Sequence, residues 1–131
     1  MNRQSRRRQQ KENNKNNNFK NKLLKAIELH SNKNFIEAEK IYFELDKSFP
    51  NNYDVIRHIG ILSQDTGKLE KAYNFFQQAI KINKKGYEAL NNIGAIHVLN
   101  KNHNLALKCF EKSIQLQPNY VPSINNIAGL Y

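Results

Sequence analysis

The chain has 131 residues, enough for one domain, and about a quarter of them are charged, while glycine and proline are scarce. This composition suits helices better than sheets. The single cysteine, Cys109, excludes an internal disulfide framework and a zinc cluster built from cysteines. No stretch approaches the roughly 18 apolar residues of a membrane span, and no apolar run of signal-peptide length follows the basic N-terminus. We therefore expect a soluble, cytoplasmic protein.

The net charge of +10 is concentrated at the N-terminus. Residues 1–22 hold one acid, Glu12, and eight basic side chains, so this segment carries +7 and the remaining residues +3. The basic residues are Arg3, Arg6, Arg7, Arg8, Lys11, Lys15, Lys20 and Lys22.

Residues 1–18 lack apolar periodicity, so we predict that they form a disordered basic tail. One interpretation of this tail is weak, salt-dependent contact with phosphates or anionic lipid. The other is a solvated tail that aids solubility. No aromatic residue precedes Phe19, so stacking on nucleic-acid bases is not supported.

Small and apolar residues recur along the rest of the chain at one fixed spacing. Gly60 and Gly94 are 34 residues apart in similar contexts, and the same step reaches Ala26 in one direction and Ala128 in the other. Further columns with this period are Ala38, Ala72 and Ala106; Tyr42, Phe76 and Phe110; Leu45, Ala79 and Ser113; and the pair Pro50 and Pro118, two periods apart. Independent columns that keep one period indicate a repeat architecture.

These columns resemble the tetratricopeptide repeat family, whose unit is a helix–turn–helix of about 34 residues. The resemblance covers residues 19–131 and implies an all-α, right-handed α-solenoid. It implies repeats at 19–52, 53–86 and 87–120, with 121–131 as the first helix of an incomplete fourth repeat. The family's usual large aromatic residue early in the first helix is absent, and Lys22, Ile56, Leu90 and Ile124 stand there.

Each repeat is predicted to form two antiparallel helices, with edges uncertain by about 2–4 residues. The predicted ranges are 19–31, 35–48, 53–65, 69–82, 87–99, 103–116 and 121–131. The small residues are expected where paired helices cross closely, and the aromatic column is expected between a second helix and the next first helix. Proline ends the second helices, asparagines such as Asn52 and Asn119 offer N-caps, and Gly67 supplies a turn.

The sequence stops inside the fourth repeat, which leaves one face of the last helix half covered. The apolar residues of that face are Ile124, Ile127 and Leu130. We expect either that this chain is the N-terminal piece of a longer protein or a truncated reading frame, or that it forms a homodimer through this helix.

Residues that could carry chemistry form no recognisable site. His30, His58, His97 and His103 lack the spacing of metal ligands, and His97 is interpreted as a packed histidine. Cys109 has no basic partner, so it is interpreted as a structural thiol. We therefore predict a protein that is not an enzyme and has no metal or other cofactor.

The family resemblance implies that the first helices of the repeats line a concave groove that binds a protein or peptide partner. The positions that recur in this groove are Arg57, His58, Ile61, Asn91, Asn92, Ala95, Asn125 and Asn126. Asn92 and Asn126 match the asparagine ladder of long tetratricopeptide superhelices such as that of O-linked N-acetylglucosamine transferase. An amide side chain matches the donors and acceptors of a peptide bond, but hydrogen bonding within a repeat or to solvent is an equal alternative.

Two other functions follow from the same family. Chaperone-binding members clamp a terminal carboxylate with Lys and Asn in the first repeat, but Leu23 and Ile27 stand there, which disfavours that function. The segments Ala26-Ile27-Glu28-Leu29-His30 and Phe35-Ile36-Glu37-Ala38-Glu39-Lys40-Ile41-Tyr42 resemble the opening repeat of bacterial proteins with a C-terminal glycosyltransferase or sulfotransferase domain. The alternative to a scaffold is therefore the N-terminal substrate-recognition arm of such a transferase, whose catalytic domain is absent from this chain.

Overall fold

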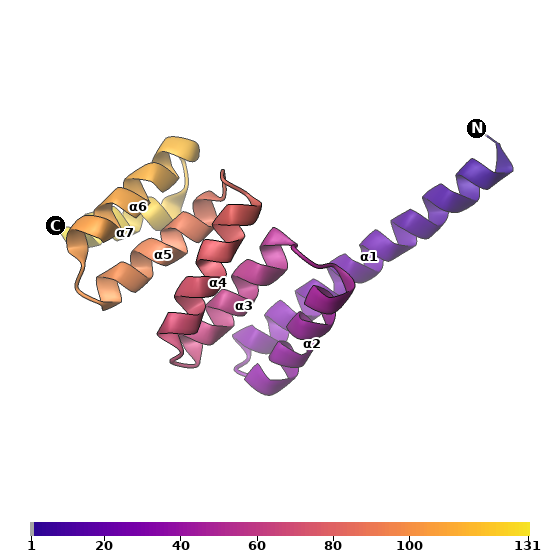
Figure 1. Cartoon of the computed structure of the whole chain (residues 1–131), viewed down its shortest axis with the longest axis horizontal. Coiled ribbons are helices and arrows are strands. Elements are labelled where there is room, and N and C mark those ends of the chain that lie inside the picture. The colour runs from indigo at the N-terminus through magenta and orange to yellow at the C-terminus, as the bar shows by residue number, and fades with distance from the viewer. Residues whose placement is uncertain (1) are drawn as a thin grey trace. The chain divides into compact units, whose positions relative to one another are not determined.

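The computed structural model describes residues 2–131, which contain seven helices and no strand, so the all-α prediction is confirmed (Figure 1). The helices are α1 (Arg3–Ser31), α2 (Phe35–Ser48), α3 (Tyr53–Asp65), α4 (Leu69–Ile82), α5 (Tyr87–Leu99), α6 (His103–Leu116) and α7 (Val121–Leu130). The chain forms two compact units, and each is described by itself. Unit 1 holds α1 and α2 and ends at Pro50, and unit 2 runs from Asn51 to Tyr131 and holds α3 to α7.

The turns inside the helix pairs share one hydrogen-bond pattern, which explains why their positions were predictable. After α3, the N–H of Lys68 donates to the carbonyl of Ser63 and the N–H of Gly67 donates to that of Gln64. This pattern closes a helix when the residue after the C-cap has a left-handed backbone. Gly67 has φ +82°, and Lys33 and Lys101, one period away on either side, have φ values of 64° and 63°. Helices α2 to α6 therefore begin and end where the repeat predicts.

Helix α1 corrects the prediction of a disordered tail, because residues 3–18 form its N-terminal half. Arg, Lys and Gln have good helix propensity, and extending an existing helix avoids the cost of nucleation. The Asn2 side chain caps the helix by accepting a hydrogen bond from the Ser5 N–H at 2.8 Å. The ring centroid of Phe19 lies 4.8 Å from that of Phe49 beyond the end of α2, and the Lys15 ammonium lies 5.5 Å from the Phe49 centroid. These contacts anchor the middle of the helix.

Unit 1 is a helical hairpin whose core contains residues of the repeat columns. Ala26 of α1 and Ala38 of α2 are fully buried, and Tyr42 and Leu45 are buried beside them. The Tyr42 hydroxyl lies 3.3 Å from Nδ1 of His30, so this buried phenol retains a polar partner. Exposed Arg, Lys and Asn side chains cover the rest of α1.

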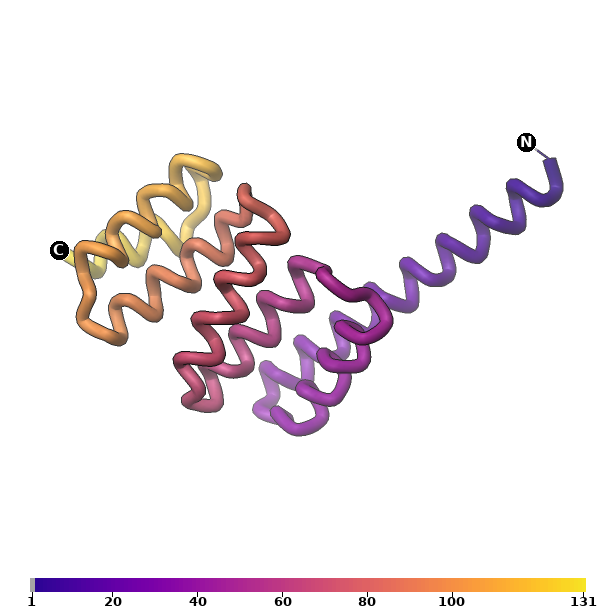
Figure 2. Tube along the Cα trace, viewed as in Figure 1, coloured from indigo at the N-terminus to yellow at the C-terminus, as the bar shows by residue number. Residues whose placement is uncertain are grey.

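Unit 2 consists of the antiparallel pairs α3/α4 and α5/α6, followed by α7, which packs on α6 and contacts α5 (Figure 2). The glycine column lets each pair approach closely. A Cβ atom on Gly60 would lie 2.6 Å from the Phe76 ring, and one on Gly94 would lie 2.4 Å from the Phe110 ring. Such distances are too short for a real side chain, so only glycine fits without a shift of the ring.

The aromatic column therefore packs within a pair as well as between pairs. Phe76 is fully buried and lies against Gly60 of its own pair, and it also joins a core cluster with Ile93 and Ile96 of the following helix. The prediction placed it only between a second helix and the next first helix. The flat ring fills both spaces because the glycine opposite it has no side chain.

The helix N-termini follow the predicted caps in one case and not in another. Asn52 caps α3, because its Oδ1 accepts a hydrogen bond from the Val55 N–H at 3.2 Å. The prediction that Asn119 caps α7 is wrong: Tyr120 is the N-cap residue and makes no side-chain cap. Pro122 lies in the first turn of α7, where a missing N–H costs nothing.

Candidate functional site

The predicted groove residues lie on α3, α5 and α7, and side chains from the start of α3 tie it to α5. The Tyr53 hydroxyl donates to the Glu88 carboxylate at 3.1 Å and accepts from the Ala89 N–H at 3.1 Å. A Cβ atom on Gly86 would lie 2.6 Å from the Tyr53 ring, so glycine makes room for this contact. Burial raises the pKa of Tyr53 above its ordinary value, and the phenol therefore stays protonated at neutral pH.

Arg57 and His58 occupy the next part of α3, and both are half-buried. The Arg57 guanidinium donates from Nη1 to Oδ1 of Asn92 at 3.3 Å, which connects α3 to α5. Nδ1 of His58 lies 2.6 Å from the backbone carbonyl of Asp54. Because a carbonyl only accepts, His58 carries a proton on Nδ1. These bonds hold both side chains in fixed orientations.

Asn91 lies in the core of unit 2, contrary to its expected place on the groove surface. It is 8% exposed, and its Oδ1 lies 2.9 Å from Ser123 Oγ and accepts from Asn126 Nδ2 at 2.9 Å. Ser123 Oγ also lies 2.7 Å from Ser113 Oγ, so α5, α6 and α7 meet at one polar cluster. The pitch of α5 turns residue 91 toward α7, and a buried amide requires such partners. Asn91 is therefore a structural link between helices.

Ile61 also lies elsewhere than expected. It is half-buried and packs against the core cluster of Ala72, Phe76, Ile93 and Ile96. Its side chain thus contributes to packing between α3, α4 and α5. A β-branched apolar residue gains more from this burial than from exposure in a polar groove.

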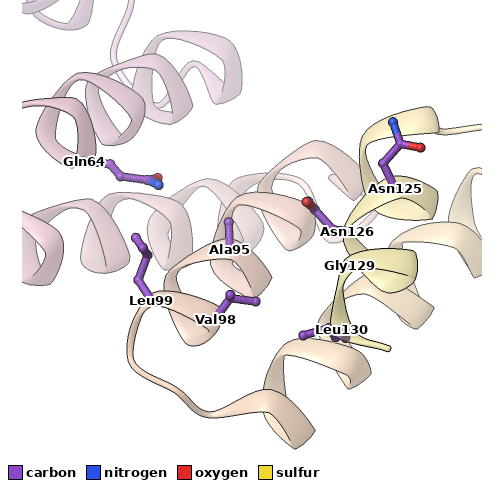
Figure 3. Close-up of a pocket in the computed structure, with 8 residues that line it drawn as sticks. All are labelled: Gln64, Ala95, Val98, Leu99, Asn125, Asn126, Gly129 and Leu130. Carbon is purple, nitrogen blue, oxygen red and sulfur yellow. The ribbon is translucent and has the colours of Figure 1, made fainter.

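The remaining groove residues surround a pocket of about 330 Å³ on the surface of α3, α5 and α7 (Figure 3). Its lining residues are Gln64, Ala95, Val98, Leu99, Asn125, Asn126, Gly129 and Leu130. Figure 3 shows the amides of Gln64 and Asn125 at opposite sides of the hollow, with Val98 and Leu99 between them. An apolar floor with amides around it suits a ligand that has both apolar side chains and peptide groups.

The pocket thus contains Ala95, Asn125 and Asn126 from the predicted set, whereas Arg57, His58 and Asn92 do not line it. Several lining residues were absent from that set. The period of 34 contained a signal for two pairs, because Gln64 and Val98 share one column and Ala95 and Gly129 share another. Leu99 and Leu130 carried no such signal, since they are apolar residues that only the packing of α5 against α7 leaves at the surface.

A second pocket, of about 410 Å³, lies between α4 and α5 on another part of unit 2. Tyr73 and His97 line it with their ring centroids 5.9 Å apart, and His97 Nδ1 is buried without a hydrogen-bond partner among the described residues. His97 is therefore half-buried beside an aromatic ring, in keeping with the packed histidine that the sequence suggested.

The residues with nucleophilic or ligating groups stay apart. Cys109 is half-buried against the cluster around Phe76, and burial raises the pKa of its thiol, which disfavours the reactive thiolate. Within residues 2–131, no three His, Cys, Asp or Glu side chains gather as a metal site would require. None of the described helices is both long and apolar enough to cross a membrane.

The fold and the site define a helical-repeat protein that presents the side chains of α3, α5 and α7 on one surface. A model of the tetratricopeptide repeat matches residues 87–120, and a second model of the same repeat matches residues 58–85. The chain belongs to the tetratricopeptide repeat family.

Known proteins share this architecture at low sequence identity. The photosystem I assembly protein Ycf3 of Rippkaea orientalis is 33% identical over 76 residues, which are 55% of this chain and 43% of the relative. The chain thus spans less than half the length of that relative.

Solved structures match over most of the chain. The first tetratricopeptide domain of Spaghetti (RPAP3), bound to an HSP90 peptide, has a TM-score of 0.75 at 18% identity, covering 86% of this chain and 89% of that one. YrrB, described as having an unusual peptide-binding site, has 0.72 at 17%, covering 82% and 55%. An O-GlcNAc transferase from Thermobaculum terrenum has 0.72 at 18%, covering 78% of this chain and 20% of that one. At these identities the similarity concerns the fold.

Proposed function

We propose that this chain is a protein-interaction scaffold that binds an extended peptide segment on the surface formed by α3, α5 and α7. The observation that carries the proposal is the pocket shown in Figure 3, which combines an apolar floor with amide side chains. Two proteins of the same fold, Spaghetti and YrrB, are described as binding peptides. The proposal includes no catalytic role and no cofactor.

The pocket assigns different parts of the peptide to different residues. An apolar side chain of the ligand would enter between Val98, Leu99 and Leu130, where it loses contact with water. The amide of Asn125 is exposed and would pair with the peptide backbone. Asn126 uses one N–H for Asn91, which leaves its second N–H and its carbonyl oxygen for the ligand.

Gly129 offers a test that fills the pocket with little effect on the fold. A Cβ atom on Gly129 meets no heavy atom within 4 Å, and Gly129 lines the pocket. Gly129→Met therefore places a long apolar side chain in the ligand's position without a clash. Ala128→Met is the matched control, because Ala128 is its exposed neighbour on α7 and does not line the pocket.

The assay begins with peptides selected from a random display library on the wild-type chain. Their affinities are then measured for each variant by fluorescence anisotropy. We expect Gly129→Met to weaken binding at least tenfold and Ala128→Met to change it less than twofold. Equal affinity for wild type and Gly129→Met would place the peptide elsewhere and refute the proposal for this surface.

The predicted amide ladder has its own test on the same peptides. Asn92→Ala and Asn126→Ala should each weaken binding, because each removes a group that matches the peptide backbone. Arg57 and Asn91 already hold one group of each side chain, so the expected loss is a few-fold rather than complete. If both variants bind like wild type, the amides serve packing between repeats and the ladder hypothesis is wrong.

A substrate-recognition arm of a larger glycosyltransferase or sulfotransferase is the second candidate. It is favoured by the similar fold of the Thermobaculum terrenum O-GlcNAc transferase, of which this chain covers 20%. Sequencing the gene beyond the codon for Tyr131 distinguishes the two candidates. An open frame that encodes a transferase domain would support the arm, and a stop codon would count against it.

A further inference from the structure

The exposed half of α1 has a charge pattern that the peptide-binding surface does not use. All of residues 3–18 are exposed, apart from no residue of unit 2 being involved, and they belong to one continuous helix of unit 1. Figure 1 shows α2 beside the C-terminal part of α1 only. The segment therefore presents its full circumference to solvent, and its side chains are available to a partner.

The helical pitch gathers the basic side chains on one side. At 3.6 residues per turn, Arg3, Arg7, Lys11, Lys15 and Arg8 point within an arc of about 140° around the helix axis. Between them on the same arc lie the amides of Gln4, Asn14 and Asn18. Glu12, the one acid of the segment, points outside the arc, as do Arg6 and Lys20. We call the arc from Arg3 to Arg8 the basic face.

This face is unfavourable for the isolated helix. Arg3–Arg7, Arg7–Lys11 and Lys11–Lys15 are like-charge pairs four residues apart, each of which destabilises a helix by roughly 0.2–0.5 kcal/mol. The first turn contains no acid, although the helix dipole favours negative charge there. A polyanion lying along the face would relieve both effects, so its binding and the helicity of residues 3–18 are thermodynamically linked.

The chemistry of the face distinguishes among polyanions. Residues 2–18 include no apolar side chain, so this helix has nothing to insert into a membrane interface. Amides interleaved with cations suit nucleic acid, where they donate to phosphates and pair with base edges. The 16 residues from Arg3 to Asn18 span about 24 Å, and the major groove of B-form DNA is wide enough for an α-helix. The major groove of A-form RNA is too narrow.

We propose that the basic face of α1 binds double-helical DNA, with the helix in the major groove and its cations on the phosphates. A continuous basic helix in the major groove is an established mode of DNA binding. The five cations of the face would neutralise about five phosphates, so the logarithm of affinity should fall with the logarithm of salt concentration with a slope of about −4.5. This activity is independent of the peptide pocket of unit 2.

The test compares two double variants that remove the same charge. Arg7→Gln with Lys11→Gln empties the centre of the face, whereas Arg6→Gln with Lys20→Gln removes two cations outside it. Glutamine is a good helix former and all four residues are exposed, so both variants should keep the far-UV circular dichroism of the parent. Binding is followed by fluorescence anisotropy of a labelled 20-base-pair duplex in 50–200 mM KCl.

We expect the variant on the face to bind at least tenfold more weakly at 100 mM salt, with a slope smaller by about 2, and the variant off the face to stay within threefold of wild type. Equal losses in both variants would indicate a diffuse polycation and overturn the proposal. So would the absence of duplex binding, or binding to duplex RNA, poly-glutamate or vesicles with 30% phosphatidylserine that is as tight as binding to duplex DNA.

Discussion

Replacing Gly94 with alanine tests the physical reason for the repeat column that carries the fold. The added Cβ would lie 2.4 Å from Cε1 and 2.7 Å from Cδ1 of Phe110. Phe110 is fully buried, so its ring has no free space into which it can move. The substitution therefore forces α5 and α6 apart or drives the ring out of its preferred rotamer.

The size of the effect is a difference between two contributions. Adding a methyl group to a well-packed core costs about 1–3 kcal/mol. Alanine in a helix interior is more favourable than glycine by roughly 0.5–1 kcal/mol. We therefore expect Gly94→Ala to lower the free energy of unfolding by about 0.5–2 kcal/mol. With a urea m-value of about 2 kcal/mol/M, the midpoint should fall by about 0.25–1 M.

The measurement is urea unfolding followed by circular dichroism at 222 nm. Gly129→Ala is the matched control, because a Cβ there meets nothing within 4 Å and the change should be neutral or stabilising. Phe110→Leu supplies a double-mutant cycle: it costs stability alone, but it should cost less in the Gly94→Ala background, where the smaller side chain makes room for the methyl group.

Two results would refute this reasoning. If Gly94→Ala is as stable as wild type or more stable, the contact with Phe110 does not limit the approach of the helices. If the two substitutions are additive within about 0.5 kcal/mol, the destabilisation does not arise from the ring.

Three further predictions concern the link between α5 and α7, the turn after α5 and the pH dependence of stability. Asn91→Ala should lower the free energy of unfolding by about 1–3 kcal/mol in urea titrations, because it leaves buried donors unpaired, whereas Asn92→Ala, at a half-buried site, should cost less than about 1 kcal/mol; similar costs would contradict the burial argument. Lys101→Gly should raise the melting temperature, since φ of 63° strains a residue with a Cβ, and Lys101→Ala should not. Burial raises the folded-state pKa of Tyr53, so stability that is complete below the unfolded pKa of about 10 should decline as pH rises above it; Tyr53→Phe should show a shallower decline in urea midpoints between pH 9 and 11, and an unchanged slope would exclude Tyr53 as the cause.

The sequence alone determined the repeat and its helices because one period of 34 residues governed several columns at once. Gly60 and Gly94 recur since each faces an aromatic ring, and Gly67 marks the left-handed turn that Lys33 and Lys101 also adopt. A pattern that repeats states its own register, so the bounds of α2 to α6 followed from it. Residues 3–18 have no such period, and the sequence did not reveal that they extend α1.

Only the tertiary structure decided what each polar residue on the repeat does. Asn91 and Asn92 are adjacent and chemically identical, yet one is buried against Ser123 and Asn126, while the other is half-buried and accepts from Arg57. A rotation of 100° along α5 separates these environments. The pocket between Ala95 and Leu130 likewise depends on how α7 packs on α5 and α6. Local sequence sets where a helix begins and ends, but the neighbouring helices determine which of its side chains remain accessible to a ligand.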